Sequence, residues 1–279
     1  MAEPTGHGWS WLSWDRISSG PDDAEQRALL LPGGLCTADE YRELMAEPAL
    51  AGVRLTAVTL PGHGGTPPPR DCGLENYARL AAECAAGLGA DVVVGHSMGA
   101  NVAIEMAASG RFRGPVILLA PSFSRQDESR FLRTLDRLAL VLGHLPYSAM
   151  LKIVDGAAKD SPLPPDRKAE LVADLRRNDP RVMRRVLRGY LGYLDRYGSV
   201  APRLRGADGP AWVVHGESGD GGITADERRL LLSRPGIRVI TLPGESFFTP
   251  AEEPALVASY LTEALAAALT AARGPAPDA

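Results

Sequence analysis

Six short apolar runs are spread along the chain, each rich in valine, isoleucine and leucine and each ending at or beside glycine or proline. Runs of this length and content are typical of strands buried on both faces, as in a parallel sheet. We therefore expect strands at Arg27–Pro32, Val53–Pro61, Asp91–Gly95, Gly114–Ala120, Ala211–Gly216 and Ile237–Pro243.

Helical patterns lie between these runs. The segment Thr37–Met45 begins with a pattern typical of a capping box, in which Thr37 is the N-cap and Glu40 stands three residues later. Strands that alternate with helices predict an α/β fold, with a mostly parallel central sheet and helices on both faces. Three further helices are expected at Leu74–Leu88, Met98–Ser109 and Pro254–Ala272.

Residues 121–200 break this alternation. Apolar side chains at helical spacing predict one amphipathic helix over residues 131–142 and another over residues 182–197, with a proline-rich stretch between them. A helical insertion between two sheet strands is typical of a cap or lid. We expect a helical lid over 121–200 and an α/β core formed by 1–120 and 201–279.

The composition is that of an ordinary globular protein: 45% of the 279 residues are hydrophobic, 23% are charged, and the formal net charge is −4. This acidic balance argues against nucleic acid or an anionic membrane as a partner. No run of 18 consecutive apolar residues occurs, and the N-terminus lacks the pattern of a signal peptide, so a cytoplasmic location is expected. The three cysteines show no CxxC spacing, so no metal site, disulfide framework or cofactor is expected.

The sharpest motif is Gly95-His96-Ser97-Met98-Gly99, which lies between an expected strand and an expected helix. In such a turn the two glycines let the backbone pass without a clash, and the helix N-terminus offers N–H groups to an anion. The motif therefore predicts a nucleophile elbow with Ser97 as the nucleophile. The alternative is an ordinary turn between a strand and a helix.

From about residue 25 to residue 270, the order of strands, elbow and lid resembles the α/β-hydrolase fold. The resemblance implies that Leu31-Pro32-Gly33-Gly34-Leu35 is the oxyanion loop. The backbone N–H of Gly34 or Leu35 would then act together with that of Met98 to bind a developing oxyanion.

The resemblance also implies a catalytic acid after the late strand at Ala211–Gly216. Asp220 is the best match to the position of this acid, and Glu217 is the next best. The alternative is a glycine-rich surface loop whose carboxylates have no catalytic role.

The catalytic histidine of the family usually lies in Pro-Gly-x-Gly-His-Phe, shortly before a helix that begins with acidic residues and proline. This chain has Pro243-Gly244-Glu245-Ser246-Phe247-Phe248, followed by Glu252-Glu253-Pro254. An ungapped comparison puts Phe247 at the histidine position, and no histidine follows residue 215. The expected triad is therefore atypical, because a serine hydroxyl is a poor nucleophile without a base.

The other histidines are weak substitutes for the missing base. His63 lies in a Gly-His-Gly turn that resembles a structural turn of the family, and His96 should point into the packing of the sheet. His215 stands at a strand end, where a structural role is expected. His144, at the terminus of a lid helix, is a possible surrogate base; its alternative is a solvated helix end.

The lid carries an excess of positive charge. Between Pro165 and Gly206, eleven basic residues stand against five acidic ones, which gives this segment a net charge of +6. The functional interpretation is a site for an anionic partner, such as an acyl carrier protein or a carboxylate-bearing substrate. The favoured alternative is a solvated helix face.

Four hypotheses follow for the function. The first is an esterase- or thioesterase-like serine enzyme that acts on a small acyl or carbonyl compound, with weak activity or a base supplied from elsewhere. The second is a lyase or cyclase on the same scaffold, because enzymes of this fold with altered triads occur in specialised metabolism. The third is a pseudoenzyme that binds a small ligand or a protein. In the fourth, Phe247 was introduced to disable the enzyme. Hydrolysis is placed first, because the family is mostly hydrolytic.

Overall fold

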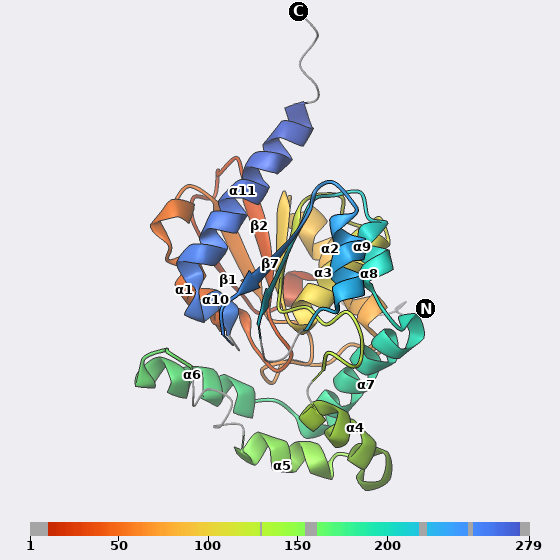
Figure 1. Ribbon diagram of the computed structural model, residues 1–279. Coiled ribbons are helices and arrows are strands. Elements are labelled where there is room, and N and C mark those ends of the chain that lie inside the picture. Colours follow the sequence, from red (N-terminus) through yellow and green to blue (C-terminus); the bar gives the residue numbers. More distant parts are fainter. Residues whose placement is uncertain (1–10, 129, 154–160, 218–221, 245–247, 274–279) are drawn as a thin grey trace, which may run out of the picture.

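A seven-stranded sheet forms the centre of the molecule (Figure 1). The computed structural model describes residues 11–128, 130–153, 161–217, 222–244 and 248–273. The strands lie in the order β1-β3-β2-β4-β5-β6-β7, and every neighbouring pair is parallel except β1 and β3. Their bounds are Arg16–Ser19 (β1), Arg27–Leu31 (β2), Arg54–Val58 (β3), Val92–His96 (β4), Val116–Leu119 (β5), Ala211–Gly216 (β6) and Ile237–Leu242 (β7).

The six strands expected from the apolar runs are confirmed, and so is the predicted α/β fold with its mostly parallel sheet. The antiparallel edge strand β1 was not predicted. Its sequence is Arg-Ile-Ser-Ser, and its one large apolar side chain, Ile17, is 42% exposed. An edge strand with so little buried surface leaves no apolar run in the sequence.

Helices cover both faces of the sheet (Figure 1). On one face, β2, β4 and β5 pack in one core cluster with α2 (Leu74–Leu88) and α3 (Met98–Ala108). On the other face, the same strands pack with α11 (Pro254–Arg273). The shorter elements are η1 (Trp11–Ser13), η2 (Ala38–Tyr41), α1 (Arg42–Met45), η3 (Pro48–Leu50), α8 (Ala201–Arg205), α9 (Ala225–Leu232) and α10 (Thr249–Glu252).

The predicted capping box at Thr37 is wrong. Thr37 does cap η2, because its hydroxyl accepts a hydrogen bond from the Asp39 N–H at 3.3 Å. The Glu40 side chain, however, does not return to the cap. Glu40 is fully buried and accepts a hydrogen bond from the Gly33 N–H at 2.8 Å, so a tertiary contact takes the place of the local one.

Among the described residues, five helices lie between β5 and β6, the last of which is the short α8. The other four lie at one end of the sheet (Figure 1): α4 (Arg130–Leu142), α5 (Leu145–Ile153), α6 (Pro165–Arg176) and α7 (Pro180–Tyr197). We call them the lid segment. The helices predicted over 131–142 and 182–197 correspond to α4 and α7, whereas α5 and α6 were not predicted. The core covers only part of the apolar face of α4, because Leu135 is buried while Phe131 and Leu138 are about half exposed.

By length and composition, α11 is the one helix among the described residues that could cross a membrane. Its apolar character follows from its place against the sheet, where Val257, Leu261, Ala264 and Leu265 are buried in the core. The C-terminal part of the helix extends past the end of the sheet (Figure 1).

Candidate functional site

Ser97 lies at a sharp turn between β4 and α3. Its backbone has φ 47° and ψ −116°, a left-handed φ that residues other than glycine rarely adopt. The turn is held by two backbone hydrogen bonds, from the Ser97 N–H to the Leu119 carbonyl (2.8 Å) and from the Ala100 N–H to the Ser97 carbonyl (2.9 Å). This geometry is that of a nucleophile elbow.

Close backbone approaches explain the two glycines of the motif. A Cβ atom on Gly95 would lie 2.3 Å from the Gly99 carbonyl oxygen, and one on Gly99 would lie 2.3 Å from the Leu31 carbonyl oxygen. No side chain fits at such distances. Gly99 therefore allows the start of α3 to pack directly against the end of β2, next to the predicted oxyanion loop.

The predicted oxyanion loop lies beside the elbow. A Cβ atom on Gly34 would be in van der Waals contact with the Met98 side chain, 3.8 Å from its Cβ. Leu35 has a left-handed φ of 71°, the second such residue in the site. No described residue accepts a hydrogen bond from the N–H of Gly34, Leu35 or Met98, as the predicted oxyanion role requires.

Behind this loop lies a buried pair that the sequence analysis missed. One carboxylate oxygen of Glu40 is 2.7 Å from Nδ1 of His96, and the other accepts the Gly33 N–H. Burial raises the pKa of Glu40, but the His96 charge and hydrogen bond, together with the Gly33 N–H, outweigh it and lower the pKa below its ordinary value. His96 thus points into the interior, as expected, and it holds a carboxylate there. Burial also raises the pKa of the adjacent Cys36 thiol, and the Glu40 charge adds to this.

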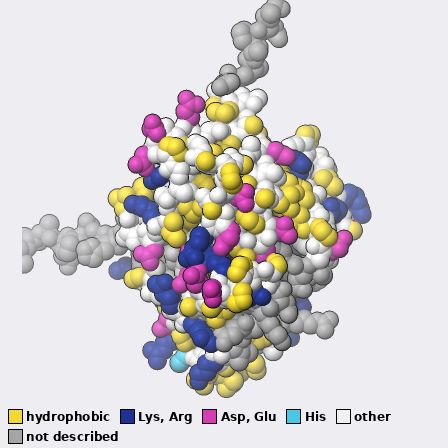
Figure 2. All heavy atoms as spheres, turned by 90° about the vertical axis from the view of Figure 1, so that its left-hand side faces the viewer, with side chains coloured by type: hydrophobic (Ala, Val, Ile, Leu, Met, Phe, Trp, Pro, Cys, Tyr) yellow, Lys and Arg dark blue, Asp and Glu magenta, His cyan; other side chains and the backbone are white. Residues whose placement is uncertain are grey.

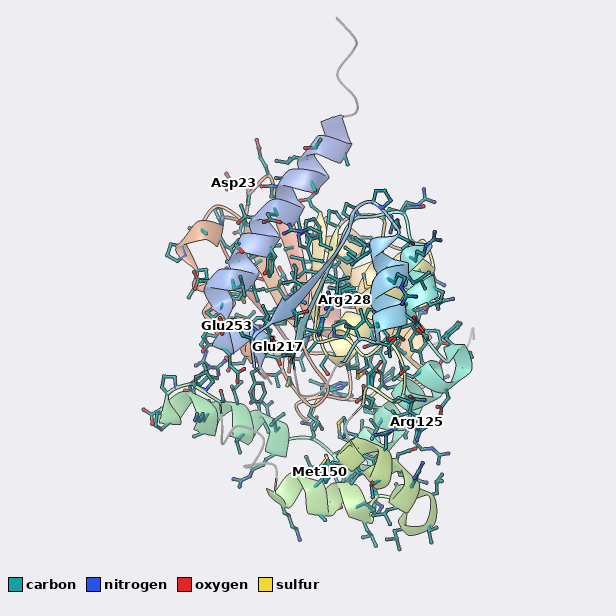
Figure 3. The ribbon with its side chains drawn as sticks, in the orientation of Figure 1. Asp23, Arg125, Met150, Glu217, Arg228 and Glu253 are labelled. Atoms are coloured by element: carbon teal, nitrogen blue, oxygen red, sulfur yellow. The ribbon has the colours of Figure 1, made fainter. Side chains whose placement is uncertain are left out.

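The predicted acid, Asp220, lies outside the described residues. The second candidate, Glu217, stands just after β6 with its side chain exposed, and one of its oxygens is 3.4 Å from the Gly244 nitrogen (Figure 3). A further carboxylate, Asp127, follows β5 and accepts the N–H groups of Phe123 (3.0 Å) and Ser124 (2.6 Å).

Asp127 is close to the loop that follows β6, since a Cβ atom on Gly222 would lie 3.8 Å from its Oδ1. Burial raises the pKa of Asp127, and the negative charge of Glu227 adds to this rise. The sequence analysis did not single out Asp127, because one carboxylate in a run of polar residues carries no local signal. Asp127 is thus a half-buried carboxylate close to Gly222, in the loop that follows β6.

His63 and His215, like His96, are held by contacts that do not involve Ser97. His63 is fully buried with Nδ1 3.2 Å from the Leu60 carbonyl, and burial lowers its pKa to about 4. His215 donates through Nδ1 to the Gly216 carbonyl (2.8 Å) and accepts at Nε2 from Arg228 (2.8 Å). Burial lowers the pKa of His215, so it is held neutral in a structural role.

His144 lies in the turn between α4 and α5, and its neighbours Leu142 and Leu145 are 50% and 60% exposed. Across the described ranges, no hydrogen bond joins any histidine to the Ser97 hydroxyl, so the surrogate role of His144 stays a prediction. Phe247 lies outside the described residues. Its neighbour Phe248 is fully buried in a cluster with Cys36, and Leu35 packs against that cluster.

At least six of the eleven basic residues between Pro165 and Gly206 have a partner within the molecule. Arg167, only 7% exposed, pairs with Asp39 and Glu43. Arg185 donates to two backbone carbonyls, at Pro69 and Arg70. The remaining fixed side chains and their partners are Arg177 with Asp174, Arg196 with Glu75, Arg203 with Glu105, and Arg205 with Ser233. These six cations therefore serve internal contacts, which leaves fewer of the eleven for an anionic partner or for a solvated helix face.

A sequence profile described as the alpha/beta hydrolase family matches residues 28–260. The chain belongs to the alpha/beta hydrolase family. A search of curated proteins finds no match. Because the match covers the parallel strands from β2 to β7, apart from the first residue of β2, together with the elbow and the lid segment, it supports a hydrolase-type enzyme.

Solved structures of other α/β hydrolases are similar over nearly the whole chain. A thermophilic esterase from Thermogutta terrifontis has 18% identity and a TM-score of 0.69, and the match covers 92% of this chain and 94% of that one. The thioesterase domain from the curacin biosynthetic pathway has 18% identity and a TM-score of 0.65 over 89% and 94%. The enol-lactonase from Burkholderia xenovorans LB400 has 16% identity and a TM-score of 0.67 over 91% and 96%. At these identities the similarity shows the shared fold.

Proposed function

We propose that this α/β hydrolase acts on the carbonyl group of a small ester or thioester, with Ser97 as its nucleophile and an atypical triad. The observation that carries the proposal is the strained elbow at Ser97, next to three backbone N–H groups that no described residue occupies. Strain and open donors at one point are typical of a site prepared for a tetrahedral oxyanion.

In the proposed reaction the Ser97 oxygen bonds to the carbonyl carbon, and the carbonyl oxygen becomes an anion bound by the N–H groups. The bond to the leaving alcohol or thiol then breaks, and water hydrolyses the acyl-serine. The hydroxyl proton needs a base, and the chain has no histidine at the expected place. Loss of that base costs on the order of 10⁶ in turnover and leaves about 10³ to 10⁴ over water. We therefore propose weak hydrolysis.

The alternative is a lyase or cyclase in specialised metabolism that uses the same N–H groups to stabilise an enolate. One observation favours it: His63, His96 and His215 are all held in structural contacts. A carboxylate of raised pKa, such as Asp127, could then move a proton in place of a histidine. A pseudoenzyme that binds a ligand or a protein is the second alternative.

A fluorophosphonate probe tests the nucleophile. Because the hydroxyl stays protonated without a base, Ser97 should be labelled at least about 10²-fold more slowly than the serine of an α/β hydrolase with an intact triad. Mass spectrometry of the labelled peptide gives the rate, and Ser97→Ala is the control for labelling elsewhere. Rapid stoichiometric labelling of Ser97 would reveal a hidden base and would argue for ordinary hydrolysis. No labelling at all would favour the pseudoenzyme.

We also propose that the substrate can be presented by an acidic acyl carrier protein that binds the exposed cations of α7. Arg181 and Arg188 are exposed, and no described residue forms an ion pair with either of them. Arg181→Glu/Arg188→Glu should raise KM several-fold for an acetylated acidic carrier protein and leave KM for acetyl-N-acetylcysteamine unchanged. The difference should shrink at high salt, because exposed charges are screened over about 8 Å at physiological ionic strength. Equal KM values for both proteins and both substrates would remove the carrier from the proposal.

A further inference from the structure

The side chain of Asn178 joins three parts of the molecule. It lies between α6 and α7 and is only 4% exposed. Its Nδ2 donates to the Leu35 carbonyl at 2.8 Å, and its Oδ1 accepts the Gly64 N–H at 3.0 Å. A further bond from Nδ2 to the Leu175 carbonyl, also 2.8 Å, fixes the amide to α6. The lid segment is therefore bonded directly to the predicted oxyanion loop.

Hydrogen bonds hold two peptide planes of this loop: Gly33–Gly34, which contains the Gly34 N–H, and Leu35–Cys36, which follows the Leu35 N–H. In the first plane, the Gly33 carbonyl accepts the Cys36 N–H at 3.2 Å, so the Gly34 N–H of that trans peptide points the opposite way. In the second plane, the Cys36 N–H makes that same bond, and Asn178 holds the Leu35 carbonyl. Asn178 thus holds the Leu35–Cys36 peptide by its carbonyl. The N–H of the same peptide binds the Gly33 carbonyl, and this bond fixes the plane that contains the Gly34 N–H.

The backbone of Leu35 shows why such a hold is needed. A leucine with φ 71° is strained, and strain of this kind persists only where the surroundings over-determine it. Glu40 fixes the loop from the core side at Gly33, and Asn178 fixes it from the lid segment at Leu35. Without Asn178, relaxation of φ at Leu35 would reorient the peptide that carries the Leu35 N–H.

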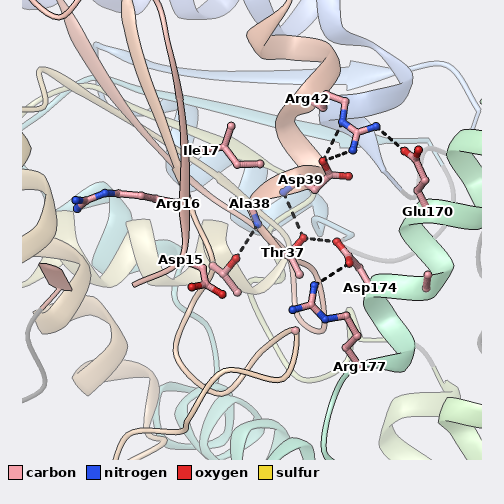
Figure 4. A pocket seen from close by; sticks show the side chains of 13 residues that line it. Asp15, Arg16, Ile17, Thr37, Ala38, Asp39, Arg42, Glu170, Asp174 and Arg177 are labelled. Atoms are coloured by element: carbon pink, nitrogen blue, oxygen red, sulfur yellow. Dashed lines mark hydrogen bonds and ion pairs between the residues drawn. The ribbon is translucent and has the colours of Figure 1, made fainter. Parts of the chain in front are cut away.

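Other contacts attach α6 to the core, so Asn178 is not needed to hold the lid segment in place. Thr37 donates to Asp174, and Arg42 bridges Asp39 and Glu170 (Figure 4). Arg167 pairs with Asp39 and Glu43. Basic and acidic side chains alternate on the surface where α1 and α6 meet (Figure 2). These contacts surround a polar cavity of about 490 Å³ between the β1 edge and α6. Beneath them, Leu171 and Leu175 pack with Cys36 and Phe248.

We propose that Asn178 is a positioning residue through which the lid segment sets the geometry of the oxyanion loop. This inference rests on the proposed function for its meaning in catalysis, but the contact itself can be tested without any turnover. The proposal assigns Asn178 no contact with substrate. Its effect passes through the Leu35 peptide to the N–H groups of Leu35 and Gly34.

The kinetic test compares Asn178→Asp with Asn178→Ala and Arg42→Gln. Asn178→Asp keeps an acceptor for the Gly64 N–H but loses the donor to Leu35, and Arg42→Gln removes an exposed attachment of α6 that does not touch the loop. Both Asn178 variants should lower kcat for p-nitrophenyl acetate about tenfold, with KM changed less than about twofold, because the loss falls on the transition state. Arg42→Gln should leave kcat within about twofold. Unchanged kcat in Asn178→Asp would overturn the proposal, and so would an equal loss in Arg42→Gln.

Amide hydrogen exchange separates this inference from the proposed function. In Asn178→Ala, exchange should become faster in a peptide spanning residues 31–37, whereas residues 165–176 of α6 should keep the native rate. Equal acceleration in both peptides would mean that Asn178 only holds the lid segment down, and the proposal would fail. If the native protein shows no turnover that depends on Ser97 but the loop peptide still responds alone, the positioning contact stands and the proposed function falls.

Discussion

Replacing Phe247 by histidine is expected to raise hydrolysis of p-nitrophenyl acetate by at least about tenfold, a small part of what a complete triad supplies. The expectation follows from what is already in place. Ser97 stands at a strained elbow, and no described residue accepts a hydrogen bond from the N–H groups proposed for the oxyanion, those of Met98, Gly34 and Leu35. Only the base that takes the serine proton has no candidate in contact with Ser97 among the described residues.

The flanking residues support residue 247 as the place for that base. The next residue, Phe248, is fully buried and packs in one cluster with Cys36, which directly follows Leu35 of the oxyanion loop. The chain at 248 thus lies against the loop that borders the elbow. The ungapped comparison with the family motif puts the histidine at the residue just before Phe248.

The experiment needs three variants besides the native protein: Phe247→His, Phe247→His/Ser97→Ala, and Phe247→Asn. The asparagine variant is matched for polarity but cannot act as a base, so it should show no gain. Burying a polar ring should cost about 1–2 kcal/mol in the free energy of unfolding, so the histidine variant should still fold. A gain that persists without Ser97 would come from the imidazole alone. A folded Phe247→His variant with no gain would mean that residue 247 is not at the base position.

The parts of the fold that the sequence predicted are those whose pattern is local. Six strands are continuous apolar runs. The elbow is a five-residue motif, and its two glycines are required because a Cβ atom at either position would lie 2.3 Å from a backbone carbonyl oxygen. The strand β1 escaped prediction because it is a polar edge strand. The helices α5 and α6 lie around a proline-rich stretch that gave no clear periodicity.

The supports of the site could not be predicted, because their partners are far apart in the sequence. Thr37 and Glu40 have the spacing of a capping box, yet Glu40 binds His96, 56 residues away. Asn178 and Leu35 are separated by 143 residues, and no motif marks an asparagine that follows a helix as a partner of a loop. For the same reason, the net charge of residues 165–206 overstated the number of cations free at the surface. Arg167, for example, pairs with carboxylates 124 or more residues earlier.

The largest loss of stability is expected from Glu40→Ala, which should lower the free energy of unfolding by about 3–5 kcal/mol. The substitution leaves His96 Nδ1 and the Gly33 N–H without their acceptor in a region that water does not reach. Buried groups that lose their partner pay the full cost of desolvation. Urea denaturation at pH 7, followed by circular dichroism, measures the change. A loss below about 1 kcal/mol would mean that the pair is dispensable.

The variant Glu40→Gln separates the charge of this carboxylate from its hydrogen bonds, and pH provides the test. The pKa of Glu40 is lowered in the folded protein from its ordinary value of 4.5, chiefly because the His96 contacts outweigh burial. A lowered pKa means that the unfolded chain binds the proton more tightly, so acid favours unfolding. The stabilisation from the carboxylate is fully present above about pH 4.5 and is lost as the pH falls through the folded value. The stability advantage of the native protein over Glu40→Gln should therefore narrow below pH 4.5. Parallel stability curves from pH 7 to pH 3 would mean that the pKa of Glu40 is the same in the folded and unfolded chains, and an advantage that widens toward acid would mean that the folded pKa is raised. Either result would contradict an ionised Glu40 paired with His96.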